Sequence, residues 1–181
     1  MALVEGVGMR FSAAAAVCVV LMLFVSCSAT KTVSAQRNGW HIDPGVGYGP
    51  IKLGMSPDEV RARLGPPPPS PGPSINALWR WPDALAVGFS VDQHTVNYVS
   101  IREQSGVTSG GARVGSTMDQ VVGEFGGSST SGSACNRITI STGGEWTMTI
   151  DYFKRGISFD FSVGASPRVK EIRIFLPRAC P

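Results

Sequence analysis

Residues 51–65 read IKLGMSPDEVRARLG and carry the local signals that begin and end a short helix. Ser56 is a favoured N-cap residue, and Glu59, three residues later, completes a capping box. Val60 and Leu64 lie four residues apart and form an apolar stripe on this helix. A helix of about two turns is not stable alone, so the sequence predicts that it packs on another element.

The same pattern returns at residues 113–126, which read RVGSTMDQVVGEFG. Thr117 occupies the N-cap position and Gln120 completes the second capping box. Val121 and Phe125 repeat the apolar pair four residues apart. The recurrence indicates an internal duplication.

Segments with alternating apolar and polar residues follow each helix and predict antiparallel strands. We therefore expect an α+β fold of two tandem repeats, each a short capped helix packed on a three- to four-stranded antiparallel sheet. The residues assigned to the core beneath the helices are Leu85, Val87, Phe89, Val91, Ile150, Phe159, Phe161, Ile172 and Ile174.

The N-terminal region has the pattern of an export signal rather than of a folded element. Residues 11–25 form an apolar run that follows Arg10, as in a signal peptide. Met9, directly before this base, suits the start of a signal peptide better than Met1. The expected organisation is a signal peptide at 1–27, a tether and irregular lead-in at 28–48, the first repeat at 49–104, a Gly-rich joint at 105–111 and the second repeat at 112–181.

Two processing sites are compatible with this signal. Residues 23–28 read LFVSCS and resemble a bacterial lipobox, in which the cysteine, here Cys27, is diacylated and becomes the mature N-terminus. The alternative is ordinary cleavage after Ala29 or Ala35, where small residues stand at the required positions. Both routes export the protein, either to the periplasmic face of a bacterial membrane or as a soluble periplasmic or secreted protein.

Export also bears on the remaining cysteines, Cys135 and Cys180. In an oxidising compartment these two can pair in only one way, so we expect a disulfide between them. Their wide spacing, without a CxxC motif, favours a structural bridge over a metal or redox site.

The motif formed by Leu53–Gly54–Met55–Ser56, Glu59–Val60 and Leu64–Gly65–Pro66 resembles the small bacterial envelope proteins of the SmpA/OmlA type. Its duplication is similar to the beta-lactamase-inhibitor-protein-like superfamily. The resemblance covers roughly residues 49–176, although the second copy lacks the Met and the closing Pro. It implies an open sheet backed by helices, with a face that binds another protein.

Composition and motifs argue against several function classes. The chain has 181 residues, a net charge of +3 and no long run of one charge sign, so nucleic-acid binding is not indicated. No catalytic, metal-binding or cofactor motif is present, and His41 and His94 are the only histidines. Asp58 and Asp119 form an obvious acid pair, but each stands near a helix N-terminus, where the dipole favours it. We therefore expect a non-enzymatic protein without cofactor or metal.

The polar side of the second set of strands is the candidate protein-binding face. Its members are Thr147, Thr149, Ser158, Asp160, Glu171 and Arg173. An antiparallel sheet can also simply expose a solvated polar face, and Trp79 and Trp81 could be core residues or interface anchors. The favoured interpretation is a lipid-anchored module that binds another envelope protein. The alternative is a secreted inhibitor or immunity-type protein that binds an exported enzyme.

Overall fold

The structure, a computed structural model, describes residues 39–67, 78–92, 94–127, 136–141 and 146–180. All of them belong to one unit, Val33–Pro181. Neither helix among these residues has the length and apolarity that a bilayer span requires. The elements in chain order are β1 (Ile42–Asp43), β2 (Gly47–Tyr48), β3 (Ile51–Lys52), α1 (Pro57–Leu64), β4 (Leu78–Arg80), β5 (Leu85–Phe89), β6 (Val96–Ile101), α2 (Met118–Phe125), β7 (Asn136–Ser141), β8 (Thr147–Tyr152), a short 3-10 helix (Phe153–Arg155), β9 (Ile157–Ser162) and β10 (Val169–Phe175).

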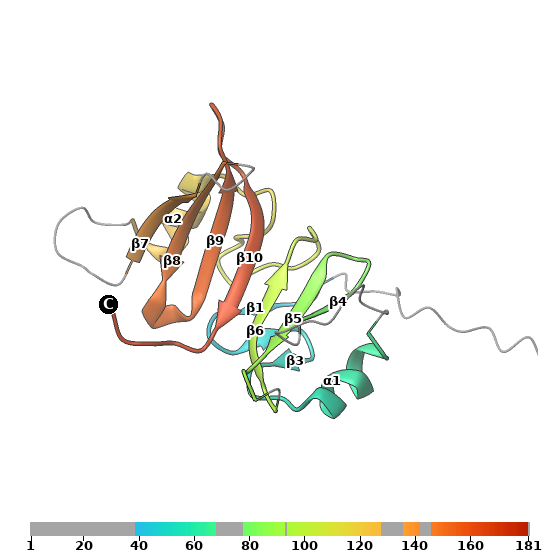
Figure 1. The fold of residues 1–181 in the computed structure, drawn as a ribbon. Helices are drawn as coiled ribbons and strands as arrows, with labels where there is room; N and C mark the ends of the chain where they lie inside the picture. The colour runs from blue at the N-terminus through green and yellow to red at the C-terminus, as the bar shows by residue number, and fades with distance from the viewer. Residues whose placement is uncertain (1–38, 68–77, 93, 128–135, 142–145, 181) are drawn as a thin grey trace, which may run out of the picture. The chain divides into compact units, whose positions relative to one another are not determined.

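Seven strands form one antiparallel sheet in the order β4-β5-β6-β10-β9-β8-β7 (Figure 1). The strands that follow α1 and those that follow α2 thus share a sheet, because β6 pairs with β10. The fold is α+β, as expected, but the strands do not form two separate sheets. A second, three-stranded sheet contains β1, β2 and β3.

This small sheet corrects the expectation of an irregular lead-in before residue 49. Ile42 and Tyr48 are fully buried and belong to the hydrophobic core. Burial of these two side chains favours regular pairing of the segment despite its Gly and Pro residues, since its backbone polar groups must find partners.

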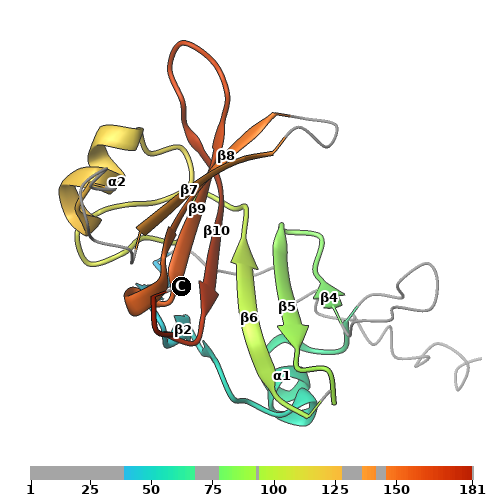
Figure 2. The same ribbon diagram turned by 60° about the vertical axis from the view of Figure 1, so that its left-hand side comes forward.

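The core lies on one face of the large sheet and includes residues from both helices and the small sheet. Val60 and Leu64 contribute from α1, and Val121 and Phe125 from α2. The Phe125 ring lies 5.1 Å from the Phe159 ring, a distance typical of aromatic pairs. Figure 2 shows α2 beside β7, β8 and β9.

Both helices begin with reciprocal caps. The Ser56 amide donates to Glu59 Oε2 (2.7 Å) and the Glu59 amide donates to Ser56 Oγ (3.3 Å). Hydrogen bonds from Ser56 lower the pKa of the Glu59 carboxyl. In α2 the Thr117 amide donates to Gln120 Oε1 (2.9 Å), and the Gln120 amide donates to Thr117 Oγ1 (3.2 Å).

The prediction that Val91 belongs to the core was wrong. Val91 is 96% exposed, whereas the other eight assigned residues are buried. Strand β5 ends at Phe89, its register with β6 shifts between Gly88 and Phe89, and the chain then turns. The alternation that places Phe89 inside therefore stops before Val91.

Candidate functional site: the open face of the large sheet

The face of the seven-stranded sheet opposite the core, called the open face below, carries side chains in rows that cross the strands. The central row contains Arg80, Ala86, Ser100, Arg173, Ser158, Asp151 and Arg137. The row on one side contains Leu78, Gly88, Tyr98 and Phe175, and the row on the other contains Glu171, Asp160, Thr149 and Thr139. At about 4.8 Å per strand spacing, the central row spans about 29 Å.

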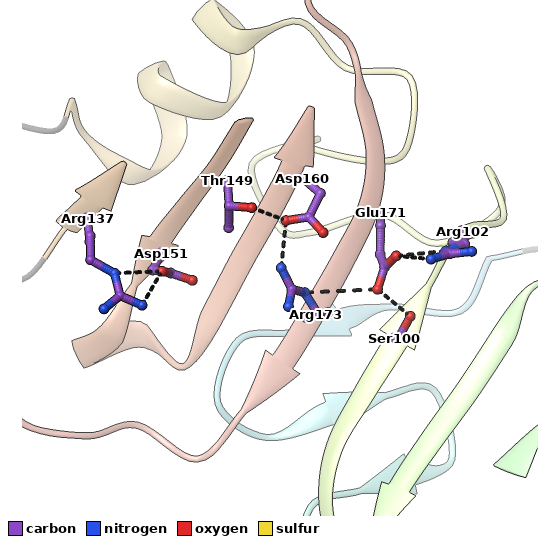
Figure 3. Close-up of polar contacts among 8 residues, drawn as sticks. All are labelled: Ser100, Arg102, Arg137, Thr149, Asp151, Asp160, Glu171 and Arg173. Atoms are coloured by element: carbon purple, nitrogen blue, oxygen red, sulfur yellow. Dashed lines mark hydrogen bonds and ion pairs between the residues drawn. The ribbon is translucent and has the colours of Figure 1, made fainter. Parts of the chain in front are cut away.

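A network of hydrogen bonds and ion pairs occupies the middle of the open face (Figure 3). Asp160 Oδ1 accepts from Thr149 Oγ1 and from Arg173 Nη2, both at 2.6 Å. Glu171 accepts from Ser100 Oγ (2.8 Å) and from Arg102 Nε (2.7 Å). The second set of bonds joins β10 to β6 through side chains.

A separate ion pair lies toward the β7 edge of the open face. Asp151 Oδ2 accepts from Arg137 Nη2 (3.1 Å) and Nε (3.3 Å). The carboxylates of Asp151, Asp160 and Glu171 are only 11–13% exposed, whereas their arginine partners are 38–66% exposed. On the open face, therefore, the acidic side chains are largely buried and paired with arginines, and the guanidinium groups are the parts exposed to solvent.

The open face contains a hollow of about 410 Å³. Its floor includes the small residues Ala86, Ser100 and Ser158, which lie in the central row beside the long side chains of Arg80 and Arg173. The other lining residues are Leu78, Trp81, Ala84, Leu85, Tyr98, Arg102, Asp151, Glu171, Phe175 and Arg178. The hollow lies where these small side chains are flanked by longer ones of the same row.

Tyr98 forms an aromatic wall of this hollow, and Gly88 makes its position possible. A Cβ atom on Gly88 would clash with the Tyr98 ring, so the ring lies across the bare backbone of β5. Burial raises the pKa of the Tyr98 hydroxyl; the Glu171 carboxylate acts in the same direction, and Arg80 and Arg173 in the opposite one. The hydroxyl therefore lies within the electrostatic field of the charged residues around the hollow.

Two arginines of the hollow lack a carboxylate partner within the part of the chain that the structure describes. Arg80 belongs to β4, and Arg178 follows β10; both are exposed. The Arg178 guanidinium lies over the Phe153 and Phe175 rings at 4.9 and 5.0 Å, which holds it by cation-π attraction. The buried Trp81 side chain also lines the hollow, and its Nε1 has no hydrogen-bond acceptor among the described residues.

The structure places all six predicted face residues on the open face, as expected. The sequence did not indicate how far these side chains are buried or bonded to one another. Thr149, Asp160, Glu171 and Arg173 bond to one another or to neighbours, and Ser158 is 2% exposed. Thr147 pairs across strands with Ser162. These residues build the floor and the network, whereas the accessible groups are arginines and aromatic residues of the hollow.

Arg80, Tyr98 and Arg178 were not among the site residues expected from the sequence. Tyr98 could have been found from the alternation along β6, which places it on the same side as Ser100. Arg80 and Arg178 carry no such signal, because they meet the hollow only through the strand order.

The other polar residues considered from the sequence lie apart from this site. His41 Nε2 is 3.3 Å from Asp43 Oδ1, and Lys52 Nζ donates to Asp43 at 2.9 Å. His94 is exposed in the turn after β5, and the described residues contain no cluster of His, Cys, Asp and Glu that could hold a metal ion. Asp58 pairs with Arg61 on α1 at 2.5 Å, and Asp119 is exposed on the first turn of α2.

The proposed lipidation site and disulfide are not described by the structure. Cys27 and Cys135 lie outside the described residues, and Cys180 lies at their C-terminal end. Both modifications therefore stay predictions.

Comparisons with known proteins give two similar solved structures. No family model and no curated protein sequence matches the chain. The uncharacterized protein YfeY from Escherichia coli is 12% identical, with a TM-score of 0.47 over 74% of this chain and 97% of that one. A DUF4309 family protein (YjgB) from Bacillus subtilis is 16% identical, with a TM-score of 0.42 over 67% of this chain and 78% of that one. At these values the function must be argued from the residues of the chain itself.

Proposed function

We propose that this chain is a non-enzymatic protein-binding module of the bacterial cell envelope, and that the open face is its binding surface. The observation that carries the proposal is the hollow, which is lined by arginine and aromatic side chains from β4, β6 and β10 and from residues that follow these strands. Arginine and tyrosine are enriched at the centres of protein interfaces. Sites built on strands and held by a supporting hydrogen-bond network are also preorganised for binding.

Support for a preorganised surface comes from the network itself. The side-chain bonds of Asp160 and Glu171 hold Arg173 and Arg102 at 2.6–2.7 Å. Because these arginine side chains are already held, they lose less conformational entropy when a partner binds them. The shared sheet makes the surface wider than the strands after either helix could provide alone.

We further propose that the chain is duplicated, exported and anchored through a lipid on Cys27. The duplication is supported by two helices with the same capping box, each followed by strands of the shared sheet. The last strands of the two sets, β6 and β10, run antiparallel side by side, as a two-fold relation between repeats would require.

Site-specific photo-crosslinking in cells that naturally produce the protein tests the binding surface. A photoreactive residue at Thr139 would lie on the open face, whereas one at Ile140, the next residue of β7, would lie on the opposite face. Both positions are exposed. We expect one discrete adduct from Thr139 that is absent at Ile140 and at Ala62 on the exposed side of α1. Equal adducts at all three positions, or none at Thr139, would contradict the proposal.

The intact mass of the mature protein tests the anchor. A diacylglyceryl addition on a chain that begins at Cys27 is expected, and Cys27→Ser should abolish it. An unmodified chain that begins at Thr30 or Gln36 would refute the anchor and favour the alternative of a soluble inhibitor.

A further inference from the structure

The charges that line the hollow are unbalanced. Arg80, Arg102, Arg173 and Arg178 face only two carboxylates, those of Asp151 and Glu171. Both carboxylates are already held: Asp151 by Arg137, and Glu171 by Ser100 and Arg102. The hollow therefore has an excess of two positive charges that its own acids do not neutralise.

This excess is concentrated at two guanidinium groups, those of Arg80 and Arg178. Neither group has a carboxylate partner in the described residues, and both line the hollow. A carboxylate that approached them would gain charge-assisted hydrogen bonds.

The two groups come from different parts of the lining of the hollow, and Arg178, whose amide donates to the Phe153 carbonyl, lies beyond the end of β10. Arg80 belongs to β4, and Arg178 follows β10, three strand spacings away in the sheet order. Three spacings correspond to about 14 Å. A ligand that reaches both must therefore carry two acidic groups on an extended frame rather than one compact anion.

The surface between them is apolar and aromatic. Leu78, Tyr98 and Phe175 line it in one cross-strand row. An extended peptide advances about 3.3 Å per residue and directs alternate side chains to one side. Residues i and i+4 of such a peptide lie about 13 Å apart on the same side, which matches the separation of the two strands that carry or precede the arginines.

Building on the proposed function, we propose that the hollow anchors an extended acidic segment of the partner protein. Acidic side chains at positions i and i+4 pair with Arg80 and Arg178, and an aromatic or aliphatic side chain at i+2 packs against Tyr98 and Phe175.

Binding of a defined probe to the purified mature protein tests this assignment. The probe is a blocked, fluorescently labelled heptapeptide with Glu, Phe and Glu at alternate positions and Thr elsewhere; its control has Gln for both Glu residues. We expect the acidic peptide to bind at least about tenfold more tightly than the Gln peptide, since each charge-assisted bond contributes on the order of a factor of ten. Its affinity should fall as salt concentration rises.

Matched variants locate the interaction. Arg80→Gln combined with Arg178→Gln should weaken probe binding about tenfold or more. Arg113→Gln combined with Lys154→Gln removes the same charge from exposed residues that do not line the hollow, and should leave binding unchanged. Equal loss in both double variants, unchanged binding in the first, or equal binding of the Gln peptide would overturn the proposal. Full competition by free phenylacetate at equal concentration would also overturn it, in favour of a small-molecule site.

The crosslinking experiment separates this inference from the proposed function. If the Thr139 adduct persists undiminished when Arg80 and Arg178 are both replaced, the acidic anchor is wrong while the open face remains a protein-binding surface. If probe binding depends on the two arginines but no open-face adduct forms in cells, the hollow binds acidic peptides as proposed. The proposal of a protein partner in the envelope is then wrong. Circular dichroism and urea midpoints of the variants identify any loss that is due to unfolding, which is not expected because both arginines are exposed.

Discussion

Removal of the Glu171 carboxylate should weaken the pairing between β6 and β10, which is called the β6–β10 joint below. Glu171 accepts from Ser100 Oγ at 2.8 Å and from Arg102 Nε at 2.7 Å, and both donors belong to the β6 side of the joint. These are side-chain bonds across the pair of strands that unites the two sets of strands in one sheet.

The size of the effect follows from exposure. The Glu171 side chain is 13% exposed and Arg102 is 66% exposed, so their ion pair is largely screened and contributes about 0.5–1 kcal/mol. The partly buried bond from Ser100 to a charged acceptor contributes about 1 kcal/mol. Glu171→Ala should therefore lower the free energy of unfolding by about 2 kcal/mol, and Glu171→Gln, which keeps an acceptor for Ser100, by about 1 kcal/mol.

Urea unfolding of the two variants measures their free energies of unfolding. Double-mutant cycles with Ser100→Ala and Arg102→Met measure the coupling of Glu171 to each donor. The coupling between Glu171 and Arg102 should decrease at high salt, whereas that between Glu171 and Ser100 should persist. A loss below about 0.5 kcal/mol for Glu171→Ala, or no coupling in either cycle, would show that these bonds do not stabilise the joint.

Four further changes have expected outcomes. Gly88→Val should destabilise the protein by about 1–3 kcal/mol in urea unfolding, because its side chain would enter the aromatic ring that lies over β5; an unchanged midpoint would contradict that placement. Burial raises the pKa of Tyr152 to about 12 from the ordinary tyrosine value of 10.0, so its contribution to stability is present below pH 10 and should be lost as the pH rises to about 12; an ultraviolet titration compared with Tyr152→Phe measures this. Thr117→Ala should cost about 1 kcal/mol by removing the cap of α2, and a neutral result in thermal unfolding would oppose this role. The bridge predicted between Cys135 and Cys180 should appear as a mass difference between reduced and oxidised protein, and its reduction should cost up to about 4 kcal/mol; two free thiols in the exported protein would refute it.

Features that depend on near neighbours were predictable from the sequence. The capping signals at Ser56 and Thr117 stand directly before α1 and α2, and both capping boxes are present in the structure. Each box joins residues three positions apart, so its geometry depends on little beyond the helix itself. The period-two alternation likewise separated the buried Ile172 and Ile174 from the less buried Glu171 and Arg173 along β10.

Alternation predicted burial less well beyond the ends of strands and on a polar face whose side chains pack against one another. Val91 continues the apolar pattern of β5 but lies beyond the strand end, and it is exposed. Ser158 and Asp160 continue a polar pattern, yet both are buried, and the Asp160 carboxylate accepts hydrogen bonds from Thr149 and Arg173. A one-dimensional pattern reports the side of a strand, but not what its neighbours cover.

The sequence by itself determined the two capped helices, the α+β class and the polarity of the strand faces. Only the tertiary structure decided that β6 pairs with β10, and this pairing places Ser100 beside Arg173 and Tyr98 beside Phe175. Pairing between strands so distant in sequence depends on the whole core, and a shift by one residue would exchange the two faces. The hollow, with Arg80 and Arg178 in its lining, therefore exists only once the complete sheet has formed.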